Sequence, residues 1–184
     1  MSSLLRLALV EVRHHPATPG RTTGPGGALA TFTALRAAQR RRAPRPVTIS
    51  TAETHGGQDT IATLKLDYTG SIGPVDVRLL PDVPASMVSV AVSRAVHSAR
   101  PRCVVVGPTL ARLWDAHNGL PTVSAHRDLT TVGVWSAFAA LLPAWSARPG
   151  RVAVLDYDPA VQAIGIATVD VAMADTSWTA AAAA

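Results

Sequence analysis

Residues 151–173 read RVAVLDYDPAVQAIGIATVDVAM, and this stretch indicates the fold class more directly than any other. Apolar and polar side chains alternate over Arg151–Tyr157, and small and apolar residues alternate over Ala163–Met173. Alternation with a period of two is typical of a strand with one buried face. Asp158-Pro159 lies between the two runs and is a turn signal. Residues 151–173 are therefore predicted to form a β-hairpin.

The same pattern recurs earlier in the chain. Ile61–Tyr68 and Val75–Leu80 alternate, and the turn residues Thr69-Gly70-Ser71 lie between them. Two half-buried strands joined by a short turn predict an antiparallel pair. Shorter strands are expected at 47–51, 101–106 and 120–125.

Two segments have helical composition. The apolar residues of 81–97 fit a helical stripe better than an alternating one, and 132–145 fits a helix or a buried strand that Pro143 interrupts. About seven short strands with frequent turns and one or two short helices predict a mainly β fold, an antiparallel β-sandwich or jelly roll. A single α+β domain is the alternative.

Charge is distributed unevenly along the chain. Residues 1–46 contain eight arginines and one acid, whereas residues 47–184 carry a slight excess of acids. Residues 16–27 are rich in Pro, Gly and Thr, a composition typical of a flexible linker. The sequence therefore predicts a basic, largely flexible N-terminal arm at 1–46 and a single globular β-rich domain at 47–184.

The most basic stretch of the arm is RAAQRRRAPR, residues 36–45. Clustered arginines repel one another and need a polyanion, and a guanidinium pairs well with phosphate. This favours binding of nucleic acid without sequence preference. A solvated surface, or a targeting presequence that is removed, would explain the composition equally. The arginines predicted to bind nucleic acid are Arg36, Arg40, Arg41, Arg42 and Arg45.

No motif of the sequence predicts catalysis. The single cysteine, Cys103, opens the apolar run Cys103–Val106, which indicates a buried strand thiol and excludes an internal disulfide. The chain has no CxxC, HExxH, GxxxxGK[ST] or GxGxxG pattern, and no apolar run of the length of a membrane span. We therefore expect no catalytic residue, no cofactor and a non-enzymatic role.

A basic arm before a β-sandwich resembles the coat proteins of small icosahedral RNA viruses. The hairpin of Pro149–Leu155 and Ile164–Val171 is similar to the last two jelly-roll strands of sobemovirus- and tombusvirus-like coats. The resemblance implies a structural capsid protein of the virion, which self-assembles into a shell and packages RNA through its arm. Its partners would be further copies of the chain and RNA, with no membrane.

The same resemblance implies a place for calcium, because such coats sometimes bind Ca²⁺ between subunits through carboxylates. The carboxylates available for this are Asp128, Asp156 and Asp158. Ordinary surface or turn aspartates are the alternative.

Two other functions remain open. Val104–Gly107 followed by Pro108–Trp114 reads as a strand that leads into a helix, which favours an α/β enzyme domain. The basic arm is also compatible with an organellar or nucleic-acid-binding ribonucleoprotein component, located in an organelle or the cytoplasm.

Overall fold

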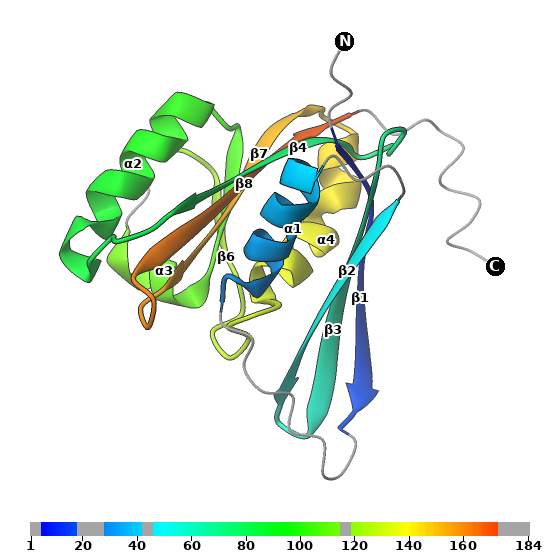
Figure 1. Cartoon of the computed structure of the whole chain (residues 1–184), viewed down its shortest axis with the longest axis horizontal. Helices are drawn as coiled ribbons and strands as arrows, with labels where there is room; N and C mark the ends of the chain where they lie inside the picture. Colours follow the sequence, from blue (N-terminus) through cyan, green and yellow to red (C-terminus); the bar gives the residue numbers. More distant parts are fainter. Residues whose placement is uncertain (1–4, 18–27, 42–45, 115–118, 173–184) are drawn as a thin grey trace.

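The computed structural model describes residues 5–17, 28–41, 46–114 and 119–172, and these form one mixed sheet with helices on both faces (Figure 1). The elements in chain order are β1 (Arg6–Pro16), α1 (Ala30–Arg41), β2 (Val47–His55), β3 (Gln58–Asp67), β4 (Gly73–Leu80), η1 (Ala85–Met87), α2 (Val88–Ala99), β5 (Cys103–Val106), α3 (Pro108–Leu113), β6 (Thr122–Ser124), α4 (Gly133–Ser146), β7 (Gly150–Asp158) and β8 (Ala163–Val171).

The eight strands lie in the order β2-β3-β1-β4-β8-β7-β5-β6. β5 pairs in parallel with both β6 and β7, and the other pairs are antiparallel. The predicted sandwich or jelly roll is therefore wrong, and the fold resembles the α+β alternative. Cys103–Val106 is buried at every position, which is typical of a parallel strand covered on both faces.

The helices divide between the two faces of the sheet. On one face, α1 and α4 pack against the sheet through Phe32, Trp135 and Phe138, and the Phe32 and Trp135 ring centroids are 5.3 Å apart. On the other face, α2 and α3 bury Val92 and Leu110. Two hydrophobic clusters therefore lie on opposite faces of the sheet, and the chain changes face between α3 and α4. No described helix has both the length and the apolar character that crossing a membrane requires.

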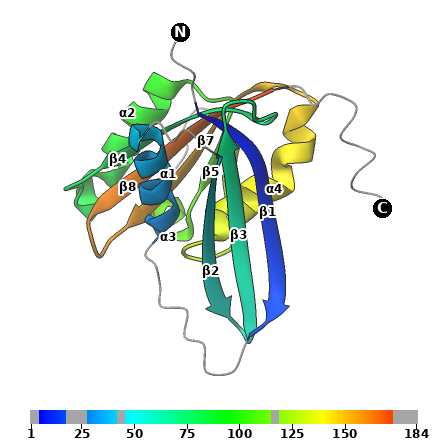
Figure 2. The same cartoon turned by 45° about the vertical axis from the view of Figure 1, so that its right-hand side comes forward.

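The N-terminal residues differ most from the sequence prediction. The segment expected to be a flexible arm contains β1, which pairs with β3 along most of its length and with the start of β4. Figure 2 shows β1, β3 and β2 side by side. Leu7 of β1 and Leu35 of α1 are fully buried. Residues 6–16 and 30–41 thus belong to the same sheet and core as the rest of the fold.

The strand pairing also differs from the sequence prediction in one place. Ile61–Tyr68 and Val75–Leu80 do form strands, but β3 lies between β1 and β2, whereas β4 pairs with β8. The predicted hairpin of residues 151–173 is confirmed as β7 and β8, with Val154 opposite Ala167. The helix predicted at 81–97 is confirmed as η1 and α2, and 132–145 is helical, with Pro143 inside α4 rather than ending it.

Candidate site at the carboxyl edge of the parallel strands

The parallel strands β5, β6 and β7 end at the same edge of the sheet, at Val106, Ser124 and Asp158. In α/β sheets, ligands bind outside the carboxyl ends of the strands, where the connecting loops leave a crevice. The loops that follow β5 and β6 lead into α3 and α4. This edge therefore brings together the amino ends of α3 and α4 and the last residues of β7.

Asp156 is the most unusual residue at this edge. Its side chain is only 1% exposed, and Oδ1 accepts a hydrogen bond of 2.8 Å from the Tyr157 N–H. Oδ2 is buried and has no hydrogen-bond partner among the described residues. Burial raises the pKa of Asp156 to about 8, and the nearby charges of Asp158 and Glu53 add to this effect. The carboxyl group is therefore largely protonated at neutral pH and can donate a hydrogen bond.

Gly107 makes room for this carboxyl group. A Cβ at Gly107 would lie 1.8 Å from Asp156 Oδ1, far inside van der Waals contact, so a side chain here would displace the carboxyl group. The Gly107 N–H donates to the Leu155 carbonyl at 2.8 Å, which holds the loop against β7. Pro108 then opens α3, a position where its missing N–H costs nothing. The close approach of the Asp156 carboxyl group to the Gly107 backbone thus requires glycine at 107.

The start of α4 is bound by a carboxylate from a distant strand. Glu53 of β2 accepts at Oε1 from the N–H and the hydroxyl of Thr130, both at 2.8 Å. Its Oε2 accepts from the Thr131 N–H at 2.8 Å and the Val132 N–H at 3.3 Å. The N–H groups before a helix are unpaired and carry partial positive charge, so a carboxylate stabilises them. Glu53 therefore links β2 to α4.

A group of charged side chains surrounds Asp128. Its Oδ2 lies 3.6 Å from His55 Nε2, 3.7 Å from His126 Nδ1 and 3.8 Å from Arg127 Nε. These distances are long for hydrogen bonds, and the side chains are largely exposed. The cluster is therefore a solvated ion-pair network of small energetic weight.

The three aspartates suggested for calcium are not brought together as one ligand set. Asp158 Oδ1 accepts from the Ala160 N–H at 2.9 Å and so closes the β7–β8 turn. Within the described ranges, no group of three or more His, Cys, Asp or Glu side chains has the arrangement that a metal ion needs. Calcium binding between subunits, through Asp128, Asp156 or Asp158, stays a prediction.

Cys103 lies away from this edge. It is the first residue of β5, opposite Val152 near the start of β7, so it is at the amino end of the parallel strands. Its side chain is buried, and burial raises the pKa of the thiol. The prediction of a buried strand thiol is confirmed.

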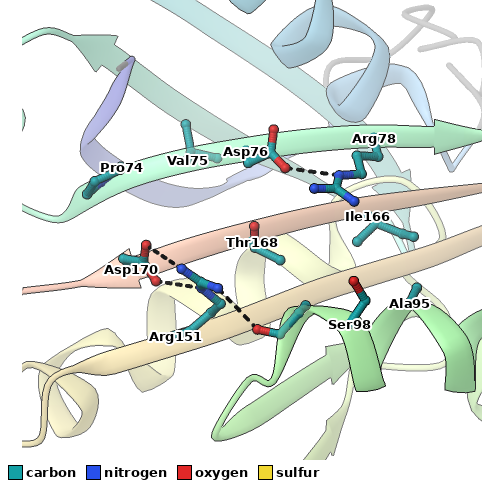
Figure 3. Close-up of a pocket in the computed structure, with 11 residues that line it drawn as sticks. Pro74, Val75, Asp76, Arg78, Ala95, Ser98, Arg151, Ile166, Thr168 and Asp170 are labelled. Carbon is teal, nitrogen blue, oxygen red and sulfur yellow. Dashed lines mark hydrogen bonds and ion pairs between the residues drawn. The ribbon is translucent and has the colours of Figure 1, made fainter. Parts of the chain in front are cut away.

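A groove of about 290 Å³ lies elsewhere, between the last turns of α2 and the outward face of β4, β8 and β7 (Figure 3). Arg151 binds both carboxylate oxygens of Asp170, at 2.7 and 3.0 Å, and Arg78 donates to Asp76 at 3.1 Å. The two arginines are thus already neutralised by neighbouring acids. The groove carries no net charge that would select a ligand, so the carboxyl edge is the stronger candidate.

The arginines predicted to bind nucleic acid are only partly described. Arg36, Arg40 and Arg41 lie in the last turns of α1, and Arg40 and Arg41 are exposed. Arg42 and Arg45 lie outside the described residues. Binding of RNA by these side chains stays a prediction.

Comparison with known proteins identifies the class of fold. No protein-family model and no curated protein sequence matches the chain. Among solved structures, the chain is similar to the ishigamide ketosynthase/chain length factor, with 16% identity, a TM-score of 0.51, and 80% of this chain and 56% of that chain covered. It is also similar to the acyltransferase ChlB3, with 17% identity, a TM-score of 0.57 and coverage of 80% and 66%.

These similarities show that the chain shares its mixed α/β fold with these two structures, and at such low identity they show the fold alone. The chain spans less than two thirds of the length of either structure.

The resemblance to viral coat proteins is therefore wrong, and the capsid function and the virion location are wrong with it. The hairpin that suggested it exists, but β7 also pairs in parallel with β5, and helices cover both faces of the sheet. Alternating strands and frequent turns do not distinguish a sandwich from a mixed sheet.

The sequence assigns the residues of this edge to separate segments and does not indicate that they lie together. The sequence predicts Asp156 as a calcium ligand or an ordinary turn aspartate and Gly107 as the end of a strand, and it assigns no functional role to Glu53. One signal is present in the sequence: Asp156 directly follows the apolar run Val152–Leu155, which places an acid inside an otherwise apolar strand. Nothing in the sequence indicates that Glu53 meets Thr130.

Proposed function

We propose that this chain is an enzyme-like domain of acyl-chain biosynthesis, which binds a carbonyl compound such as an acyl thioester at the carboxyl edge of β5, β6 and β7. Its fold is similar to that of a ketosynthase/chain length factor and an acyltransferase, whose names both denote chemistry on acyl groups. Asp156 lies at the carboxyl edge of the parallel strands, the edge at which α/β sheets generally bind their ligands.

The observation that carries the proposal is the buried Asp156 carboxyl group with its unpartnered Oδ2. A carboxyl group that is neutral at pH 7 can donate a hydrogen bond or a proton to a carbonyl oxygen, which an ionised one cannot. Burying a polar atom without a partner costs free energy, and a bound carbonyl compound would supply the missing partner. Asp156 is therefore assigned as the proton donor to the bound carbonyl.

The proposed chemistry does not use a cysteine thioester. Cys103 is the only cysteine of the chain, and it is buried at the amino end of β5. Burial disfavours the thiolate that a nucleophile requires. The acyl group would therefore bind without a covalent bond to cysteine.

The test is binding of acetyl-coenzyme A, measured by calorimetry between pH 6 and pH 9. We expect binding that weakens as the pH rises through about 8, because Asp156 loses its proton there. Asp156→Ala should abolish binding, and the control Asp158→Asn, two residues along the same strand, should retain it. Equal binding by wild type and Asp156→Ala would overturn the assignment, as would an acetyl adduct on Cys103 in the intact mass.

A second candidate is a binding subunit that holds an acyl chain for a catalytic partner without transferring it. The place of Cys103 favours this candidate, because no thiol is available at the carboxyl edge. Release of free coenzyme A distinguishes the two. Thiol release above the background rate, and lost in Asp156→Ala, supports the enzyme, whereas binding without release supports the subunit.

A further inference from the structure

β2 ends the row of strands β1, β3 and β2 (Figure 2), and one side of its backbone has no neighbouring strand among the described residues. The turn that joins β2 to β3 is Gly56-Gly57, where both glycines have positive φ. Such a two-residue turn leaves its flanking residue His55 hydrogen-bonded to β3, and the residues bonded to β3 then alternate along the strand. Thr48, Ser50 and Ala52 fall at the other positions, so their N–H and C=O groups point away from β3.

This edge lacks the features that usually prevent strand addition. Native proteins protect an edge strand with Lys or Pro, with a bulge, or by making the strand very short. Val47–His55 is nine residues long, contains no Lys, Arg or Pro, and keeps an unbroken register with β3. The opposite end of the sheet differs, because β6 has three residues and Pro121 directly precedes it. β2 is therefore the end of the described sheet that is suited to accept another strand.

The sequence of β2 is complementary to a second copy of itself. An antiparallel pair centred on Ser50 places Ser50 opposite Ser50 of the second copy, and Thr48 opposite Ala52. These side chains are small, and Thr48 and Ser50 are exposed, so no side chain blocks the approach. Like charges do not face each other in this register: Glu53 lies opposite Val47, and its carboxylate is bound to the start of α4. Three residues of each copy, paired with two hydrogen bonds per pair, exchange about six hydrogen bonds.

We propose that the free edge of β2 is the interface of a homodimer, in which two copies of the chain pair antiparallel through Thr48, Ser50 and Ala52. The two eight-stranded sheets then form one continuous sheet. The same residues of both copies make the contact, so the interface has two-fold symmetry and closes at two copies rather than building a shell. This inference goes beyond the proposed function and does not require acyl chemistry.

The register is tested by cross-linking Ser50→Cys with copper phenanthroline, followed by non-reducing gel electrophoresis and intact mass. Cα atoms of directly opposite residues in a hydrogen-bonded antiparallel pair are about 5.5 Å apart, a distance that a disulfide spans. We therefore expect a disulfide-linked dimer. Thr48→Cys, exposed on the same strand, is the matched control: two Thr48 residues are four positions out of register, about 13 Å along the strand, so this variant should not cross-link. The double variant Thr48→Cys/Ala52→Cys should cross-link again. Cys103 is buried and common to all variants.

The oligomeric state is measured by size-exclusion chromatography with light scattering over a dilution series of the full chain. We expect twice the mass of the chain for the wild type. Ser50→Lys would place two ammonium groups opposite each other at the two-fold axis, so it should give a monomer at concentrations where the wild type is a dimer. Thr63→Lys, on the adjacent strand β3 where Thr63 contacts Ser50 through its hydroxyl, should remain a dimer. Thermal unfolding shows that each variant is folded.

A wild type with the mass of one chain throughout the dilution series would overturn the proposal, as would species that continue to grow beyond two copies. Thr48→Cys that cross-links as efficiently as Ser50→Cys would overturn the register. If Ser50→Lys does not unfold cooperatively, the cysteine variants decide, because cysteine replaces only the hydroxyl of Ser50 by a thiol. No thioester enters these experiments, so this proposal and the proposed function can fail separately.

Discussion

At the scale of the residue, Asp156 links the site to the stability of the protein. Its pKa in the fold is about 8, against an ordinary value of 3.8, because burial disfavours the charged form. The folded state therefore binds more protons than the unfolded state between these values. Below about pH 4, Asp156 is protonated in both states and does not lower the free energy of unfolding. As the pH rises from there through about 8, the free energy of unfolding falls progressively, because the unfolded state loses this proton first.

Asp156→Asn should remove this dependence, because asparagine fills the same space and does not titrate. The free energy of unfolding of the wild type, relative to the variant, should fall between pH 5 and pH 8 by up to about 1.4 kcal/mol per pH unit. Urea unfolding at a series of pH values measures the difference. Asp76→Asn, which removes an exposed acid of β4 paired with Arg78, is the control, and parallel curves for wild type and Asp156→Asn would contradict the expectation.

Gly107→Ala should destabilise the fold although one methyl group is all that it adds. The new Cβ would overlap Asp156 Oδ1, so either the carboxyl group or the loop before α3 has to move. We expect a loss of about 1–3 kcal/mol, the usual range for overpacking. The control is Ser98→Ala on α2, which should leave stability unchanged. Gly57→Ala does not serve as a control, because φ of Gly57 is +77° and a side chain there would strain the backbone. Thermal unfolding of both variants checks this prediction.

At the scale of the element, the aromatic side chain of Phe32 is the largest that α1 buries against the sheet. Phe32 is fully buried, contacts Trp135 of α4, and lies over Gly165 of β8, where a Cβ would come within 2.6 Å of the ring. Glycine at 165 therefore lets α1 approach the sheet closely. Both α1 and α4 depend on this ring for their packing.

Phe32→Ala should cost about 3–5 kcal/mol, the range for removing a buried aromatic side chain. Thr33→Ala, at the exposed neighbouring position, should change stability by less than about 0.5 kcal/mol. Guanidinium unfolding monitored by tryptophan fluorescence measures both. A small effect of Phe32→Ala would mean that α1 does not pack as described.

The elements also show what the sequence could and could not predict. Local periodicity identified β7, β8 and α2, because alternation and helical stripes are properties of consecutive residues. It did not predict which strands are neighbours: the order β3-β1-β4 places residues far apart in the chain next to one another. For the site, Asp156 could be singled out as an acid in an apolar strand, but its close contact with Gly107 depends on tertiary structure.

At the scale of the whole molecule, residues 1–46 are expected to be essential for folding. β1 lies between β3 and β4, so its removal would separate β2 and β3 from the other strands. It would also remove α1, which supplies Phe32 and Leu35 to the larger hydrophobic cluster. Residues 47–184 alone should therefore have the circular dichroism and urea response of an unfolded or molten chain.

The control for this prediction is a shorter N-terminal truncation that ends before β1. Deletion of Met1–Ser3 removes neither β1 nor α1, so it should leave the cooperative unfolding transition in place. A stable, cooperatively unfolding 47–184 fragment would show that the first strand and helix are dispensable.

The position of β1 has a consequence for synthesis of the chain. β1 leaves the ribosome before the other described elements, and its neighbours in the sheet, β3 and β4, are translated only after α1 and β2. Until then, an apolar segment with strand propensity has no partner for its backbone, and such segments aggregate. Nascent chains that stall before β4 should therefore recruit chaperones or precipitate, whereas complete chains bury the same residues in the middle of the sheet.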